Sequence, residues 1–171
     1  MSEVFYNHFI YGPLTRKEYQ NMIKDLPNSS NTIIATYHGF NYNPHGICLN
    51  PHKERFGDKD YYVELRTAMN KAGRWVCSVD WSMNGGGWSS GVWCGDKDFE
   101  TEEEAKYSLL TSVEAGLRRK IKSIEETEEY EDDYEFDYGE LRKQENRAKK
   151  CRSLLKKVLY YQEVYNNQTL F

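Results

Sequence analysis

The clearest alternation of apolar and polar residues covers positions 74–94. One face of the strand predicted at 74–83 carries Trp75, Cys77, Val79, Trp81 and Met83. The Asn-Gly-Gly-Gly run at 84–87 predicts a tight turn, and a return strand to residue 94 completes a hairpin. With a two-residue loop at 85–86, we expect Cys77 and Cys94 to face each other as small apolar residues rather than as a disulfide.

Helical spacing of apolar residues dominates the last third of the chain. Thr101 followed by Glu104 predicts a capping box for a helix from 102 to at least 124. This helix either ends near 124 or continues to about 138, and Gly139 is the expected break before a second long helix at 141–165. Its predicted buried stripe is Leu110, Val113, Leu117, Ile121 and Ile124, and that of the second helix is Ala148, Cys151, Leu154, Leu155, Val158 and Tyr161 or Gln162.

The N-terminal half gives shorter patterns. Strands are predicted at 4–11 and 32–38, and Thr15 with Glu18 predicts a capped helix at 16–26. Residues 39–57 are predicted to be irregular, and 58–72 to form a short helix. The expected fold is α+β: a small antiparallel sheet centred on the 74–94 hairpin packs on helices, with a long C-terminal helical hairpin. We expect a core domain at 1–124 and an acidic-then-basic helical extension at 125–171, packed on the same domain.

Composition narrows the class of protein. The chain has 171 residues, of which 15% are aromatic, which is typical of one folded domain and not of a disordered chain. The N-terminus has no signal-peptide pattern, and no apolar run reaches the roughly 18 residues that a membrane span requires. The net charge of −4 does not indicate a protein that is basic throughout. We therefore expect a cytoplasmic protein that has reduced cysteines and does not bind membranes.

The charge is strongly segregated along the sequence. Residues 125–140 contain ten acids and no base, whereas residues 141–171 carry a net charge of +6. We call residues 125–140 the acidic block. Closely spaced carboxylates on one helix repel each other unless a cation or a partner relieves them. The relief is either external, from a partner with a basic surface, or internal, from the basic start of the next helix.

For the external case, interleaved aromatic side chains would supply the apolar contacts of an interface. The predicted partner-binding residues are Glu125, Glu126, Glu128, Glu129, Tyr130, Glu131, Asp132, Asp133, Tyr134, Glu135 and Asp137. The alternative is a nucleic-acid-binding module that uses the basic helix, with contacts from Arg142, Lys143, Arg147, Lys149 and Lys150. If the basic segment has no binding role, it is the exposed face of a packed helix.

A third alternative is a zinc protein or a small metal-dependent enzyme. The weak candidate ligands are His38, His45, Cys48 and His52, whose spacing fits a standard structural zinc site only loosely. Asp80 with His38 or His45 is a conceivable acid–base pair, but nothing in the sequence fixes its geometry. No nucleophile elbow, phosphate loop or zinc-protease motif is present in the sequence. We therefore expect no cofactor and no catalytic activity.

In general character the chain is small, acidic, rich in Tyr and Asn, and without a catalytic motif. In this it resembles accessory proteins of phages and other mobile elements, including inhibitors of bacterial defence nucleases. The likeness implies a non-enzymatic protein whose acidic, Tyr-rich helix blocks the nucleic-acid-handling surface of a protein partner. A homodimer through the last two helices is a further expectation, since their apolar stripes can pair between chains as well as within one.

Overall fold

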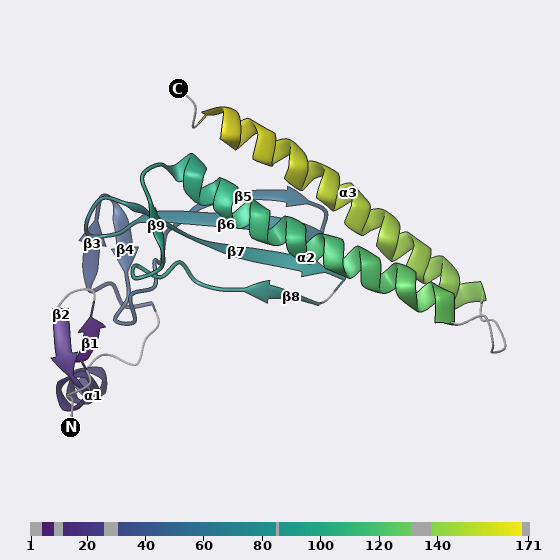
Figure 1. The fold of residues 1–171 in the computed structure, drawn as a ribbon. Helices are drawn as coiled ribbons and strands as arrows, with labels where there is room; N and C mark the ends of the chain where they lie inside the picture. The colour runs from purple at the N-terminus through teal and green to yellow at the C-terminus, as the bar shows by residue number, and fades with distance from the viewer. Residues whose placement is uncertain (1–4, 9–11, 26–30, 85, 131–137, 169–171) are drawn as a thin grey trace.

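The computed structural model describes residues 5–8, 12–25, 31–84, 86–130 and 138–168 and shows the predicted α+β fold (Figure 1). Two long helices lie over one face of a five-stranded sheet, and the last turns of the first and the first turns of the second extend past it. The elements are β1 (Phe5–His8), β2 (Gly12–Thr15), α1 (Arg16–Asp25), β3 (Ala35–Tyr37), β4 (Phe40–Tyr42), β5 (His52–Gly57), β6 (Tyr61–Met69), β7 (Trp75–Met83), β8 (Gly86–Ser89), β9 (Asp98–Phe99), α2 (Glu102–Tyr130) and α3 (Tyr138–Gln168).

The central strand β6 occupies the segment where a helix was expected at 58–72, so that prediction was wrong. β6 pairs antiparallel with β5 on one side and with β7 along its whole length on the other. Its buried side chains Tyr61, Val63 and Leu65 alternate with half-buried polar ones. That spacing of two is the period of a strand, and residues 62–67 of β6 are paired on both edges.

The stretch at 39–57, expected to be irregular, contains two strands. β4 forms a hairpin with β3, and its Phe40 and Tyr42 are buried. β5 is an edge strand of the five-stranded sheet. In the segment that connects β4 to β5, Cys48 forms an isolated bridge with Tyr42 of β4. The polar and glycine-rich composition hid these strands because most residues of β5 are exposed. The strand expected at 32–38 is confined to β3. Of the strand expected at 4–11 the structure describes β1, which pairs with β2 just beyond that range.

The β7–β8 hairpin forms, but in a different register from the expected one. Trp81 pairs with Trp88 and Met83 with Gly86, whereas a loop at 85–86 would have paired Met83 with Trp88. Asn84 takes a positive φ of 56°, as the first position of a primed hairpin turn requires. β8 ends at Ser89, and Cys77 pairs with Thr67 of β6 instead of Cys94. The cross-strand cysteine pairing was therefore wrong, and all four cysteines are free thiols.

Both predicted capping boxes are confirmed. The Thr15 hydroxyl accepts the Glu18 backbone N–H at 3.3 Å, while the Glu18 carboxylate accepts the Thr15 N–H at 2.8 Å. The Thr101 hydroxyl likewise accepts the Glu104 N–H at 3.2 Å at the start of α2. Gly139 is not the break between the long helices, because it lies in the first turn of α3.

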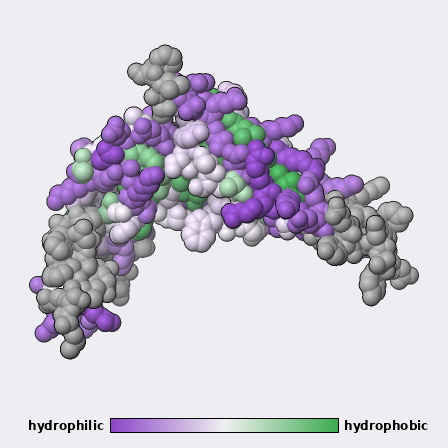
Figure 2. All heavy atoms as spheres, viewed as in Figure 1, coloured by the Kyte–Doolittle hydropathy of each residue, from purple (hydrophilic) through white to green (hydrophobic). Residues whose placement is uncertain are grey.

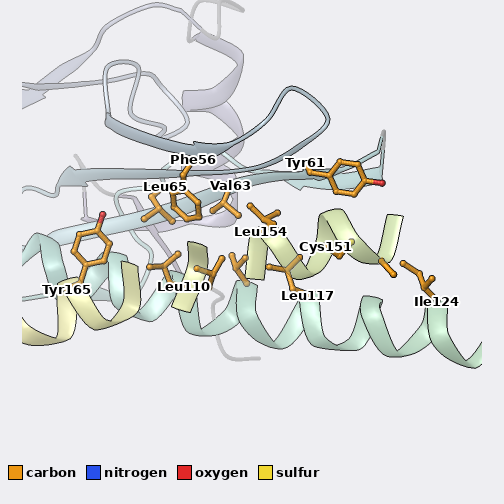
Figure 3. Packing of buried hydrophobic residues seen from close by; sticks show 13 residues of the cluster. Phe56, Tyr61, Val63, Leu65, Leu110, Leu117, Ile124, Cys151, Leu154 and Tyr165 are labelled. Atoms are coloured by element: carbon orange, nitrogen blue, oxygen red, sulfur yellow. The ribbon is translucent and has the colours of Figure 1, made fainter. Parts of the chain in front are cut away.

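One hydrophobic cluster joins both long helices to the sheet (Figure 3). Its buried members are most of the predicted helix stripes together with Tyr165 and strand residues: Phe56, Tyr61, Val63, Leu65, Leu110, Val113, Leu117, Ile124, Ala148, Cys151, Leu154, Val158 and Tyr165. Ile121, Leu155 and Tyr161 of the predicted stripes are partly buried against it. A second cluster at the other end of the sheet consists of Phe40, Tyr42, Cys48, Ala68, Val76, Val92 and Cys94. Hydrophilic side chains cover most of the outward surface of α2 and α3 (Figure 2).

Candidate functional site

Three adjoining hollows surround Tyr61, where the first half of α3 passes the turn ends of β6 and β7. Their volumes are about 200, 240 and 80 Å³. We call the three together the basic groove. The charged and polar side chains that line it are Asp58, Asn84, Lys120, Lys143, Asn146, Arg147, Lys150, Ser153 and Lys157.

Helical periodicity explains why α3 supplies most of the cations. Lys143, Arg147, Lys150 and Lys157 are spaced by four, three and seven residues, so they fall on one side of the helix. Leu154 completes the stripe and is buried against the sheet, which turns this side of α3 toward the groove. By the same spacing the exposed Lys149 falls on the other side of the helix.

The charge of the groove is strongly unbalanced. Five basic side chains line it, against one carboxylate, that of Asp58. Of the five, only Lys150 has a carboxylate within 4.0 Å among the residues that the structure describes. The groove is therefore a local concentration of positive charge in a chain whose net charge is −4.

Asp58 is already engaged by the backbone. Its carboxylate accepts the N–H of Tyr61 at 2.7 Å and the N–H of Asp60 at 2.9 Å, in the turn between β5 and β6. The hydrogen bond from Tyr61 is the main reason that the pKa of Asp58 lies below its usual value, and the charges of Lys150 and Lys157 lower it further. Asp58 thus holds the turn and, because its lowered pKa keeps it ionised, it places one negative charge among the five cations.

Tyr61 and Asn84 give the groove a fixed floor. Tyr61 is 5% exposed, its pKa is raised mainly by burial, and the Lys150 ammonium lies 5.0 Å from the centre of its ring. The backbone N–H of Asn84 donates to the carbonyl of Asp60 at 2.8 Å, which ties the β7–β8 turn to the start of β6. The cations consequently surround a rigid wall, and binding there costs little ordering of the backbone.

The acidic block lies mostly outside the described residues. Of its side chains the structure describes two: Glu125 pairs with Arg152 of α3, and Glu126 pairs with Lys122 at 3.3 Å. Both carboxylates are paired within the chain, but only Glu125 is paired by a cation of the next helix, as the internal alternative expects; Glu126 is paired by a lysine of its own helix. The predicted partner-binding side chains of Glu128, Glu129, Tyr130, Glu131, Asp132, Asp133, Tyr134, Glu135 and Asp137 fall outside what is described, as does that of Arg142 in the basic segment. Their roles stay predictions.

The proposed histidine and cysteine ligands have separate surroundings. His38 and His45 are exposed, whereas Cys48 is buried, which raises the pKa of its thiol. His52 makes edge contacts with Phe40 and lies 3.3 Å from the Glu102 carboxylate. Within the described part of the chain, no three His, Cys, Asp or Glu side chains are grouped to hold a metal ion.

The conceivable acid–base pair does not form either. Asp80 accepts a hydrogen bond from Arg66 at 2.8 Å, on the face of the sheet away from the helices. Arg66 also contacts Glu64 at 2.7 Å, so this cluster is an internal ion-pair network. Burial raises the pKa of Cys77 and of Cys94 to about 12, which keeps both thiols protonated and poorly nucleophilic.

Sequence reasoning found part of the groove and missed part. It named Lys143, Arg147 and Lys150 as a basic segment, but it also included Lys149, which helical spacing places on the other side. The four-three-seven spacing was the signal that separates these residues. No comparable signal identified Lys120 and Asn84, because they come from other elements and reach the groove only through the tertiary fold.

Comparison of the chain with protein-family models, with curated proteins and with solved structures gave no match. Among the helices that the structure describes, none combines the length and the apolar character that crossing a membrane requires.

Proposed function

We propose that the protein acts by binding rather than by catalysis, and that its ligand is a nucleic acid whose phosphates lie in the basic groove. The observation that carries the proposal is the convergence of cations from α2 and α3 on one groove, where Asp58 is the one carboxylate among the described lining residues. Phosphate contacts by Lys and Arg supply most of the affinity of sequence-independent nucleic-acid binding.

The dimensions suit a backbone rather than a single small anion. From Lys143 to Lys157 the helix axis rises about 21 Å, at 1.5 Å per residue. One strand of B-form DNA places about six phosphates over that length. A run of several phosphates therefore engages the whole stripe, whereas an isolated phosphate engages one or two of its members.

Net charge does not decide against this ligand. At physiological ionic strength, charges farther than about 8 Å are largely screened. The cations that line the groove are in contact distance of a bound phosphate, and the low-dielectric wall formed by Tyr61 and Leu154 focuses their field. The local surplus thus outweighs the overall −4.

The decisive measurement is the salt dependence of binding to a fluorescently labelled oligonucleotide, followed by anisotropy. If Lys120, Lys143, Arg147 and Lys150 each neutralise one phosphate, the affinity for a single strand falls about 50-fold between about 50 and 200 mM salt. An affinity that does not respond to salt would overturn the proposal.

A matched pair of charge reversals locates the site. Lys143→Glu with Arg147→Glu should weaken binding at least tenfold, because two phosphate contacts become repulsions. Lys149→Glu with Lys156→Glu changes the net charge equally, on exposed positions of the other side of α3, and should change affinity only a few-fold. Equal losses in the two variants would place the binding outside the groove.

A second candidate function is the binding of a basic protein surface by the acidic block. Its support is the composition of residues 125–140, with ten acids and no base. Charge would accelerate encounter with such a partner, and the interleaved tyrosines would slow dissociation. The test reverses the charge of four carboxylates by replacement with lysine: Glu128, Glu129, Asp132 and Asp133. This variant should no longer capture a basic partner but should remain folded, and unchanged capture would eliminate this function.

A further inference from the structure

Trp88 is the most exposed tryptophan among the described residues. Its exposed fraction is 62%, although a tryptophan side chain normally buries most of its large surface. It lies in β8, which is an edge strand of the five-stranded sheet. Neither long helix lies over β8 in Figure 1. The aromatic ring is thus available at the border of the helix-covered face.

The register of the hairpin fixes the side on which the ring stands. Trp88 pairs directly with Trp81, and paired residues of antiparallel strands share a face of the sheet. Trp81 and Met83 pack against the cluster between sheet and helices. Trp88 therefore projects on the helix-covered face of the sheet, which is also the face on which the basic groove opens.

Trp88 is also close to the groove along its own strand. Gly86 lines the largest hollow, together with Lys120 and Arg147. Positions 86 and 88 are two residues apart, hence on the same face and about 7 Å apart along the strand. An aromatic platform therefore stands roughly one step along the strand from the cations of the groove.

The local backbone holds this platform in place. A Cβ on Gly87 would come within 2.0 Å of the Trp81 carbonyl oxygen, so the hairpin packs as closely there as a glycine permits. The turn is further tied to β6 through Asn84. The backbone that carries the ring therefore needs little ordering when a ligand stacks on it.

We propose that the ligand of the groove is a single-stranded nucleic acid, one base of which stacks on Trp88. This inference rests on the proposed function, since the phosphates of the same strand lie in the groove. Base stacking on aromatic side chains beside a basic channel is the general means of binding single strands without sequence preference. A duplex keeps its base faces stacked internally and cannot use the platform.

The test compares Trp88→Ala with Tyr160→Ala, a matched control on α3 that is 61% exposed. Anisotropy is measured with a labelled thymidine oligonucleotide and with a duplex. Trp88→Ala should weaken single-strand binding roughly 5-fold to 150-fold, as expected for the loss of one stacked base, and leave duplex binding and the salt slope unchanged. Tyr160→Ala should leave both affinities unchanged.

A second readout uses the intrinsic fluorescence of the tryptophans, with Trp88→Phe as the conservative variant. The oligonucleotide should quench part of the wild-type emission, and Trp88→Phe should lose that quenching while it keeps most of the affinity. Full single-strand affinity in Trp88→Ala, or undiminished quenching in Trp88→Phe, overturns the stacking inference while the groove still stands. Wild-type binding that ignores salt refutes the groove itself.

Discussion

The ion pairs that anchor the start of α2 allow a quantitative test of the packing. The Lys106 ammonium lies 3.1 Å from the Glu54 carboxylate of β5 and 3.2 Å from that of Glu102. Glu102 also accepts the buried Thr67 hydroxyl of β6 at 2.7 Å. The Lys106 and Glu102 side chains are only 16% and 18% exposed, so water screens them poorly.

Replacing Lys106 by Met keeps the aliphatic stem and removes the charge. The carboxylates of Glu102 and of the 35% exposed Glu54 then lose their shared cation, and breaking a fully buried pair in this way costs about 3–5 kcal/mol. Since these groups retain some exposure, we expect a loss of about 2 kcal/mol at neutral pH. At a typical urea dependence of about 2 kcal/mol per molar, the unfolding midpoint falls by about 1 M urea.

Lys122→Met is the matched control. It removes the lysine of another pair with a glutamate four residues away on α2, but Lys122 is 74% exposed and its partner Glu126 is 58% exposed. Exposed pairs of this kind contribute about 0.3–0.5 kcal/mol. Equal stability losses in the two variants would refute the argument that burial, rather than pairing alone, gives Lys106 its weight.

The pH dependence supplies an independent check. Burial alone would raise the pKa of Glu102, but the Thr67 hydrogen bond and the Lys106 charge outweigh it, and the pKa is lowered overall. A carboxyl whose pKa is lower in the folded state stabilises the fold above its unfolded value, and that stability is lost as the pH falls through the folded value. The difference between wild type and Lys106→Met should therefore shrink in acid, and a constant difference would contradict the assignment.

Two further predictions concern glycines and the acidic block. Gly87→Ala should destabilise the protein by about 1 kcal/mol or more, because its Cβ would meet the Trp81 carbonyl, whereas Gly116→Ala in α2, where nothing lies within 4 Å, should stabilise it by about 0.5–1 kcal/mol. Thermal unfolding distinguishes them, and shifts of the same sign would disprove the steric argument. The second prediction neutralises four acids of the acidic block: Glu128, Glu129, Asp132 and Asp133. Oligonucleotide affinity should rise a few-fold in the anisotropy assay, because less negative charge then repels the phosphates, and a lower affinity would count against the groove.

Local signals in the sequence predicted local structure well. Thr101 and Glu104 define a helix start through contacts three residues apart, and the stripe from Leu110 to Ile124 follows from the helical repeat alone. The predicted pairing of β7 with β8 was wrong by two residues, because the Asn-Gly-Gly-Gly run offers more than one favourable turn. In the fold the Asn84 N–H bonds to the Asp60 carbonyl, a long-range contact of the turn that the turn sequence does not encode.

The candidate site depended on long-range contacts. Tyr61 and Lys150 lie in elements that meet only in the folded molecule, and Tyr61 was assigned to a helix in the sequence-based prediction. The error at 58–72 therefore also concealed the floor of the groove. Charge composition drew attention to the acidic block, whereas the electrostatic feature that the structure describes best is the stripe from Lys143 to Lys157.

The shared cluster between sheet and helices has a consequence for synthesis of the chain. Val63 in the central strand and Val158 near the C-terminal end belong to the same cluster, so the apolar face of the sheet awaits residues translated much later. Because a ribosome releases the chain from its N-terminus onward, that face stays open to water, and to other nascent chains, until α3 has emerged. The fold is therefore completed late in translation. A ribosome stalled before α3 would leave an intermediate with an exposed apolar face, which is a typical substrate of chaperones.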